Sequence, residues 1–248
     1  MVDSKVFGRF HNDEYEIISY SDNYWEQCDK VLNDAFYDLE YVCIGYGINL
    51  PGTEEVRKEL STLVRETTKD GVSLLAREIS TGEIVGFSFN KLQLKPTSDE
   101  LSFFEIIRDR CQNPTSKAYI QMMIDCDKEL DLFDQFKTDC LMELMFLGVT
   151  PTHGRKSIGK TLTDYTIRLA LELKNGNYLD LLPADLKSAR PTIVTSLFAS
   201  KVSQSIGRSM GFEFFNRFPY TDIWFDGKSL AERIGTDDEA TILCIKFL

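Results

Sequence analysis

The chain has 248 residues, with 28 Lys and Arg against 39 Asp and Glu, which gives a formal net charge of −11 at pH 7. Apolar residues make up 43% of it, too large a share for a disordered chain. The acidity argues against nucleic acid or an anionic membrane surface as the main partner. It favours a cationic small-molecule substrate, which a negative cleft would concentrate.

The N-terminal residues 1–7 contain no apolar signal core, and no run approaches the ~20 apolar residues of a membrane span. None of the six cysteines has C-x-x-C spacing, and the chain has only two histidines. We therefore expect a cytoplasmic protein with reduced, buried cysteines and no metal site.

The periodicity of apolar residues predicts a chain in which strands and helices alternate. In chain order it predicts a strand at 15–19, a helix at 21–36 capped by Ser21 or Asn23, a helix opened by Thr53, strands at 72–79 and 83–94, helices within 98–136, strand 141–149, helix 158–173, strand 192–198, helix 200–210, and strands 212–218 and 240–247. This order predicts one α/β domain over residues 1–248, with a mixed central sheet flanked by helices.

Residues 141–149 are nearly all apolar, which is typical of a central strand buried on both faces. A helical insertion of about 96–138 precedes this strand. Its acidic residues at 125, 127, 129 and 131 scatter around the helix circumference, so we expect a solvated helix face there and no cation site.

The loop after the central strand is the most informative segment. It holds Arg155, Lys156 and Lys160, with no acid from Thr150 to Thr163. Small residues and the backbone N–H groups of a helix N-terminus favour a bound phosphate. The alternative is an ordinary connection with solvated basic residues. The spacing fits neither a P-loop nor a dinucleotide fingerprint.

Several motifs together resemble a known family. Val149-x-Pro151 followed by Gly154-Arg155-Lys156-Ser157-Ile158-Gly159 resembles the acetyl-CoA motif of the GNAT acetyltransferases. The segments 132–136, 36–40 and 203–212 are similar to motifs of the insect and nematode type of arylalkylamine N-acetyltransferase. The chain departs from the pattern at Gly154, where the motif has Gln or Arg, and at Ser157, where it has Gly.

The resemblance implies a GNAT-like fold with splayed central strands and an acetyl-CoA co-substrate. Backbone groups of Leu147 and Val149 would pair with the pantetheine arm. The residues that it implies for the cofactor are Leu147, Gly148, Val149, Gly154, Arg155, Lys156, Ser157, Ile158, Gly159 and Lys160.

The resemblance also implies two catalytic candidates. An alkylammonium has a pKa of about 10.4, so the acceptor amine must lose a proton, and Glu40 is the candidate base, acting through water. The alternative for Glu40 is an ordinary solvated loop residue. Ser203 either protonates the leaving thiolate or serves as the N3 residue of a helix capped by Ser200. Gly207 stands where many GNAT enzymes carry a general-acid tyrosine.

The implied reaction is direct transfer of an acetyl group from acetyl-CoA to an arylalkylamine such as dopamine, tyramine, octopamine or serotonin. The candidate walls of the acceptor pocket are Phe36, Tyr37, Tyr46 and Tyr220. The alternatives are another amine, such as a polyamine or amino acid, or a CoA-binding protein without catalysis. We expect a monomer. Residues 98–143 hold 11 acids against 5 basic residues, and we expect this acidic segment to face the acceptor cleft.

Overall fold

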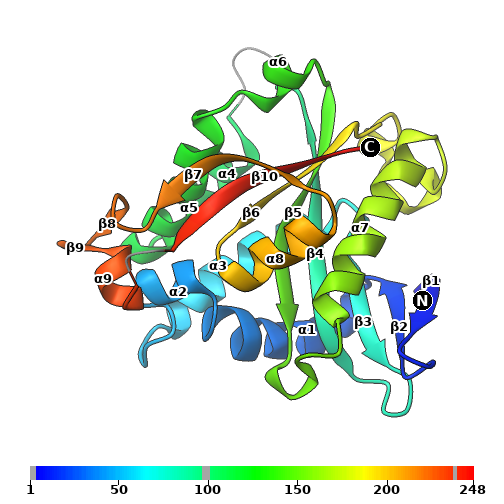
Figure 1. Ribbon diagram of the computed structural model, residues 1–248, viewed down its shortest axis with the longest axis horizontal. Helices are drawn as coiled ribbons and strands as arrows, with labels where there is room; N and C mark the ends of the chain where they lie inside the picture. Colours follow the sequence, from blue (N-terminus) through cyan, green and yellow to red (C-terminus); the bar gives the residue numbers. More distant parts are fainter. Residues whose placement is uncertain (1–3, 97–100, 237–238) are drawn as a thin grey trace.

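The structure is a computed structural model that describes residues 4–96, 101–236 and 239–248 (Figure 1). Its centre is an eight-stranded sheet of order β1-β2-β3-β4-β5-β6-β10-β7. The strands are β1 (Val6–Phe10), β2 (Tyr15–Ser19), β3 (Leu74–Glu78), β4 (Ile84–Leu94), β5 (Cys140–Val149), β6 (Ile193–Phe198), β7 (Glu213–Pro219) and β10 (Ala240–Phe247). Among the described strand pairs, β5–β6 alone is parallel. The predicted mixed sheet is confirmed.

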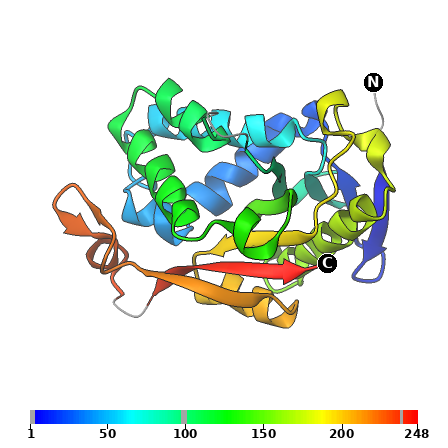
Figure 2. The same cartoon turned by 90° about the horizontal axis from the view of Figure 1, so that it is seen from above.

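Helices cover both faces of the sheet (Figure 2). They are α1 (Trp25–Val31), a π-helix (Leu32–Tyr37), α2 (Tyr41–Gly45), α3 (Glu54–Thr68), α4 (Phe103–Arg110), α5 (Pro114–Lys128), α6 (Leu132–Phe136), α7 (Ile158–Lys174), α8 (Lys201–Ser209) and α9 (Leu230–Ile234). Figure 2 shows α1 to α5 on one face and α7 and α8 on the other. The insertion expected before the central strand is α4 to α6, between β4 and β5.

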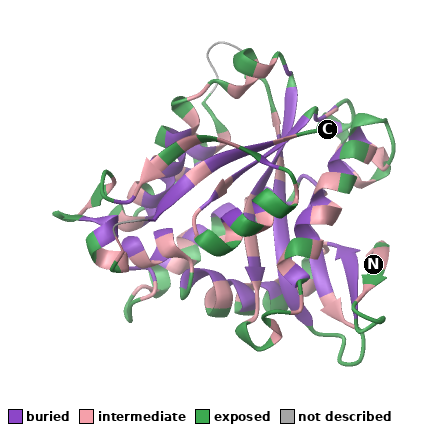
Figure 3. Ribbon diagram, in the orientation of Figure 1, coloured by how far each residue is buried: buried purple, intermediate pink, exposed green. Residues whose placement is uncertain are grey.

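Each face of the sheet has its own apolar core (Figure 3). On the α7 side, Ile158, Leu162, Leu169 and Leu173 are buried as their helical spacing predicts, whereas Tyr165 is only partly buried. On the other side, α3 buries its predicted apolar face of Val56, Leu60, Leu63 and Val64. None of the helices in the described ranges combines the length and apolar character needed to cross a membrane.

Some local predictions were wrong. Neither Ser21 nor Asn23 caps α1, because a 3-10 turn at Asp22–Tyr24 precedes the helix and Ser21 makes no capping bond. The strand β1, the helix α2 and the short hairpin of β8 (Trp224–Phe225) and β9 (Lys228–Ser229) were not predicted. These elements are too short for a clear periodicity.

The strands β5 and β6 diverge, as the expected GNAT-like fold requires. β4 and β5 pair over nine positions, from Gly86↔Val149 to Leu94↔Cys140. β5 and β6 pair only from Leu141↔Ile193 to Glu143↔Thr195. At the end of this pairing the Ser196 hydroxyl donates to the carbonyl of Leu144 at 2.9 Å. Figure 1 shows the two strands separating towards α8. Burial on both faces accordingly ends near Leu144, beyond which exposure alternates.

The helix α8 packs so closely on β6 that one position has no room for a side chain. A Cβ added at Gly207 would lie 2.5 Å from the ring of Phe198. That ring is 2% exposed and contacts Phe212 edge-on, with 5.3 Å between ring centroids. A tyrosine at this position would therefore not fit against Phe198.

We predict that Gly207→Ala lowers the free energy of unfolding by about 1–2 kcal/mol, because overpacking outweighs the better helix propensity of alanine. Denaturant unfolding followed by circular dichroism measures the change. Ser205→Ala, on the exposed side of the same helix, is the control and should be nearly neutral. A stabilised Gly207→Ala variant would contradict the close contact.

Candidate functional site

A cleft of about 290 Å³ opens where β5 and β6 diverge. Its walls come from the π-helix and α2, from α5, and from β5, α7, β6 and α8. The residues that line it include Phe36, Glu40, Tyr119, Met122, Met123, Met145, Leu147, Gly148, Val149, Gly159, Ser196, Leu197, Ala199, Ser200 and Ser203. The cleft thus brings together predicted residues that lie far apart in the sequence.

The edge of β5 that faces the cleft has free backbone groups. The N–H of Thr150 donates to Val85 of β4 at 2.9 Å. Since backbone groups of successive strand residues point to opposite edges, those of Leu147 and Val149 point towards the gap left by β6. Gly148 is required here, because a Cβ would lie 2.6 Å from the ring of Phe87. The open edge can therefore pair with an extended, amide-containing ligand.

The basic loop joins β5 to α7 through a 3-10 turn at Pro151–His153. Arg155 and Ser157 adopt left-handed backbone conformations, with φ of 64° and 60°. Such conformations cost about 1 kcal/mol or more in residues other than glycine, and they cluster at functional sites. Ser157 takes this conformation at the position where the GNAT motif has glycine, which gives a physical reason for the motif.

The N-terminus of α7 has the backbone groups that can bind an anion. The first N–H groups of the 17-residue helix have no partner within it, and its dipole favours negative charge there. Gly159 lies in the cleft, where an added Cβ would be 3.5 Å from Ile206 and 3.7 Å from Val149. The absent side chain leaves the space between β5 and α8 open.

The three predicted cations differ in their surroundings. Lys156 donates to the Tyr15 hydroxyl at 2.6 Å, and this bond, together with the charges of Glu14 and Glu78, raises the pKa of Lys156. Arg155 and Lys160 are exposed and form no hydrogen bond or ion pair with the residues that the structure describes. Arg155 and Lys160 are therefore the cations available to a phosphate.

Glu40 is the N-cap of α2 and lines the cleft. Its carboxylate accepts hydrogen bonds from the N–H groups of Val42 at 2.9 Å and Cys43 at 2.8 Å. Burial raises the pKa of Glu40, while these two bonds oppose that rise. A carboxylate with a raised pKa is a stronger base than an ordinary glutamate.

Ser203 lies in the cleft at the start of α8, where it forms a capping box with Ser200. The Ser203 hydroxyl accepts from the N–H of Ser200 at 3.1 Å and donates to its carbonyl at 3.0 Å. The Ser200 hydroxyl accepts from the N–H of Ser203 at 3.2 Å. Ser203 therefore serves as the N3 residue of the capping box, and it also lines the cleft.

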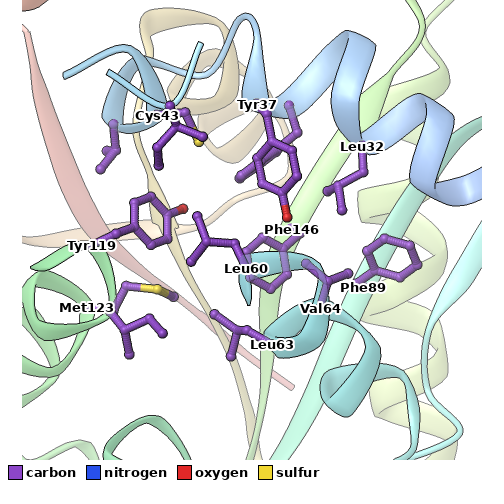
Figure 4. Close-up of a cluster of buried hydrophobic side chains, with 14 of the residues drawn as sticks. Leu32, Tyr37, Cys43, Leu60, Leu63, Val64, Phe89, Tyr119, Met123 and Phe146 are labelled. Atoms are coloured by element: carbon purple, nitrogen blue, oxygen red, sulfur yellow. The ribbon is translucent and has the colours of Figure 1, made fainter. Parts of the chain in front are cut away.

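Of the four aromatic residues predicted for the acceptor wall, Phe36 lines the cleft and the other three do not. Tyr37 lies in the apolar core (Figure 4), with its hydroxyl 3.3 Å from that of Ser61. Tyr46 packs against Tyr119 and Phe225. Tyr220 is fully buried and donates to the carbonyl of Ala199 at 2.6 Å, so it holds the β6–α8 junction.

The cleft residues that sequence reasoning missed include Tyr119, Met122 and Met123 of α5 and Met145 of β5. Helical spacing placed the α5 residues on an inner face, and the structure shows part of that face bordering the cleft. No pattern within α5 distinguishes these residues from core residues. In the described ranges no group of three or more His, Cys, Asp or Glu could hold a metal ion.

No protein-family model matches the sequence, and no curated protein matches it. Solved structures do match. Arylalkylamine N-acetyltransferase 2 from Aedes aegypti has a TM-score of 0.75 at 20% identity, over 94% of this chain and 98% of that one. A mosquito arylalkylamine N-acetyltransferase-like protein 5b has a TM-score of 0.75 at 15% identity, over 94% and 100%.

A polyamine N-acetyltransferase from Drosophila melanogaster, which forms N-acetylagmatine, has a TM-score of 0.71 at 14% identity, over 94% of this chain and all of that one. All three proteins are below 25% identity, so the likeness concerns the fold. The expected GNAT fold, and the resemblance to insect arylalkylamine N-acetyltransferases, are confirmed at that level.

The capping box predicts that Ser203→Ala lowers the free energy of unfolding by about 1 kcal/mol, since two hydrogen bonds at the start of α8 are lost. Thermal or denaturant unfolding measures this. Ser205→Ala makes the same chemical change on the exposed face of α8 and should have little effect. Equal stability of the two variants would mean that the box contributes nothing.

Proposed function

We propose that the protein transfers an acetyl group from acetyl-CoA to a primary amine. The observation that carries the proposal is the cleft itself, because it joins the free edge of β5, the N-terminus of α7 and the carboxylate of Glu40. The fold adds support, since N-acetyltransferase is the activity named for all three similar structures.

Acetyl-CoA fits the residues present. The pyrophosphate would lie on the N–H groups at the start of α7, with Arg155 and Lys160 nearby. The space beside Gly159 would admit the pantetheine arm, whose amides would pair with the backbone of Leu147 and Val149. This path brings the thioester into the cleft that Glu40 lines.

The ammonium loses two protons, one before the attack and one as the amide forms, and the leaving sulfur gains one. Glu40, acting through water, would take a proton from the ammonium, so that the neutral nitrogen can attack the thioester carbonyl. The C–N bond forms, the C–S bond breaks, and the sulfur leaves as a thiolate. As the amide forms, the nitrogen loses a second proton. Ser203, which lines the cleft, would relay this proton: its hydroxyl would donate a proton to the thiolate and take up the one released by the nitrogen.

We propose an arylalkylamine as the acceptor, because Phe36, Tyr119 and three methionines give the cleft an apolar and aromatic lining. A second candidate is an amine that carries another cationic group. Asp127 and Glu143, which line a cavity beside the cleft, favour such an amine. Three of the four aromatic residues first expected at the acceptor lie outside the cleft, so they do not contribute to the choice between these classes.

Thiol release from acetyl-CoA in the presence of an amine panel tests the reaction. The panel should contain tyramine, dopamine and serotonin, together with spermidine and an amino acid. Mass spectrometry of the products identifies the acetylated amine. No release with any amine, at protein concentrations that bind acetyl-CoA in calorimetry, would leave a CoA-binding protein without catalysis.

We predict that Glu40→Gln lowers kcat about 10²–10⁴-fold, the range for loss of a general base. Because burial raises the pKa of Glu40, wild-type activity should fall with decreasing pH through an ionisation above the ordinary glutamate value. The variant should lose that part of the pH profile. Glutamine keeps only one of the two capping bonds of Glu40, so the melting temperature should fall slightly, and circular dichroism checks that the variant is folded at the assay temperature. An unchanged rate would exclude Glu40 as the base.

For the cofactor we predict that Arg155→Ala weakens acetyl-CoA binding about 5–10-fold, as expected for the loss of one exposed phosphate contact. The effect should shrink at high salt, since exposed charges are screened. Lys174→Ala, at the opposite end of α7, is the control. Equal affinities of the two variants in calorimetry would contradict a phosphate site at this loop.

A further inference from the structure

A second cavity lies on the α4–α5 side of the sheet, beside the cleft. Its volume is about 670 Å³. Its walls are the end of β4, the start of α4, the C-terminal part of α5, α6, and the paired half of β5 and β6. Ser196 and Leu197 line both this cavity and the cleft, so the two spaces are neighbours across one stretch of β6.

Four acidic residues line this cavity, and two of them, Glu143 from β5 and Asp127 from α5, form no ion pair with the described residues. Glu143 is only 5% exposed, and one of its oxygens accepts a hydrogen bond from the Gln93 amide. Asp127 is partly buried and forms no hydrogen bond or ion pair with any described residue. The expected solvated face of α5 is therefore corrected at this position, because Asp127 points into a cavity.

No cation of the described residues pairs with either carboxyl group. The three lysines around the cavity are each bound to another acid. Their ion pairs are Lys91 to Asp70 at 2.9 Å, Lys95 to Asp134 at 2.7 Å and Lys128 to Glu105 at 3.2 Å. The remaining charged residue of the lining, Asp131, is also acidic. Neither Asp127 nor Glu143 therefore has an ion-pair partner among the described residues, although the charge of Lys91 acts to lower the pKa of Glu143 against the effect of burial.

Two buried carboxylates without a counter-ion are costly. Burial raises the pKa of both Asp127 and Glu143, and the negative charge of Asp127 raises that of Glu143 further. The other walls are apolar, with Leu92, Phe103, Phe104 and Ile124 among them. Carboxylates at one place and apolar walls elsewhere suit an ammonium group on an alkyl chain.

We propose that Asp127 and Glu143 bind the distal ammonium group of a linear di- or polyamine whose other amino group lies in the cleft. This inference rests on the proposed function and argues for the second acceptor class, an amine with another cationic group, over an arylalkylamine. Glu143 and Leu147 are four residues apart on β5, at most about 13 Å at the rise of a strand. A linear polyamine can span that separation, whereas a monoamine can occupy only one of the two sites.

Calorimetry with spermine tests the subsite on the intact chain without acetyl-CoA. Asp127→Asn and Glu143→Gln remove one charge each with little change of shape. Each should weaken spermine binding about tenfold or more, the expected loss for a hydrogen bond to a charged group. Asp125→Asn, an exposed acid two residues away on the same helix, should bind like the wild type. Butylamine, which can occupy only one of the two sites, should bind the wild type more weakly than spermine.

A proton count gives a second readout. If the free protein holds the pair partly protonated, a bound ammonium group should expel a proton, and the binding heat should depend on the ionisation enthalpy of the buffer. Asp127→Asn and Glu143→Gln should reduce that dependence. Spermine binding that is absent in the wild type, or equal in all variants, would overturn the proposal.

The experiments can reject the subsite and the acetyl transfer independently of each other. If tyramine is acetylated but neither variant changes spermine binding or its kcat/KM, the subsite is rejected while the proposed function remains. If the variants lose spermine binding but no amine releases thiol, the subsite stands and the transferase is rejected. A loss of kcat/KM for spermine, with the value for tyramine unchanged, supports both.

Discussion

The loss of pairing between β5 and β6 is the constraint on which the site depends. The two strands pair through Glu143↔Thr195 and no further, although β5 continues to Val149. An unpaired strand edge inside a protein must find other partners. On the other side β5 keeps its full ladder with β4, so its free edge is held rigidly and offers hydrogen bonds at a fixed place. A ligand with amide groups can complete this edge without any movement of the backbone.

Close contacts around this edge keep it both open and accessible. Gly148 lets the ring of Phe87 lie against β5, and Gly207 lets α8 approach Phe198. At the mouth, Gly159 leaves space between Val149 and Ile206. At Gly148 and Gly207 the lack of a side chain permits contacts that any Cβ would block.

The sequence predicted the parts of the fold that follow from periodicity. The apolar run at 141–149 and the 3.6-residue spacing of α7 are long patterns, and both elements lie where they were expected. The loop between them was identified from composition, because three cations without an acid are unusual in so acidic a chain. Single-residue placements were less predictable. Tyr37, Tyr46 and Tyr220 follow apolar patterns that fit a core or a pocket wall equally well, and only tertiary packing decides between them.

Asp127 shows why the charge pattern of a helix is an incomplete guide. Its neighbour two residues earlier, Asp125, is exposed as expected, while Asp127 faces a cavity that Glu143 of β5 also lines. A strand brings Glu143 to that place, and no helical spacing contains this information. β5 therefore contributes an acid in its paired half and free backbone groups in its open half. One rigid strand contains both the acid and the free backbone groups. The number of residues between them would therefore set the separation between a bound cation and the reacting carbonyl. Changes in α5 alone would alter the affinity for the cation without altering that separation.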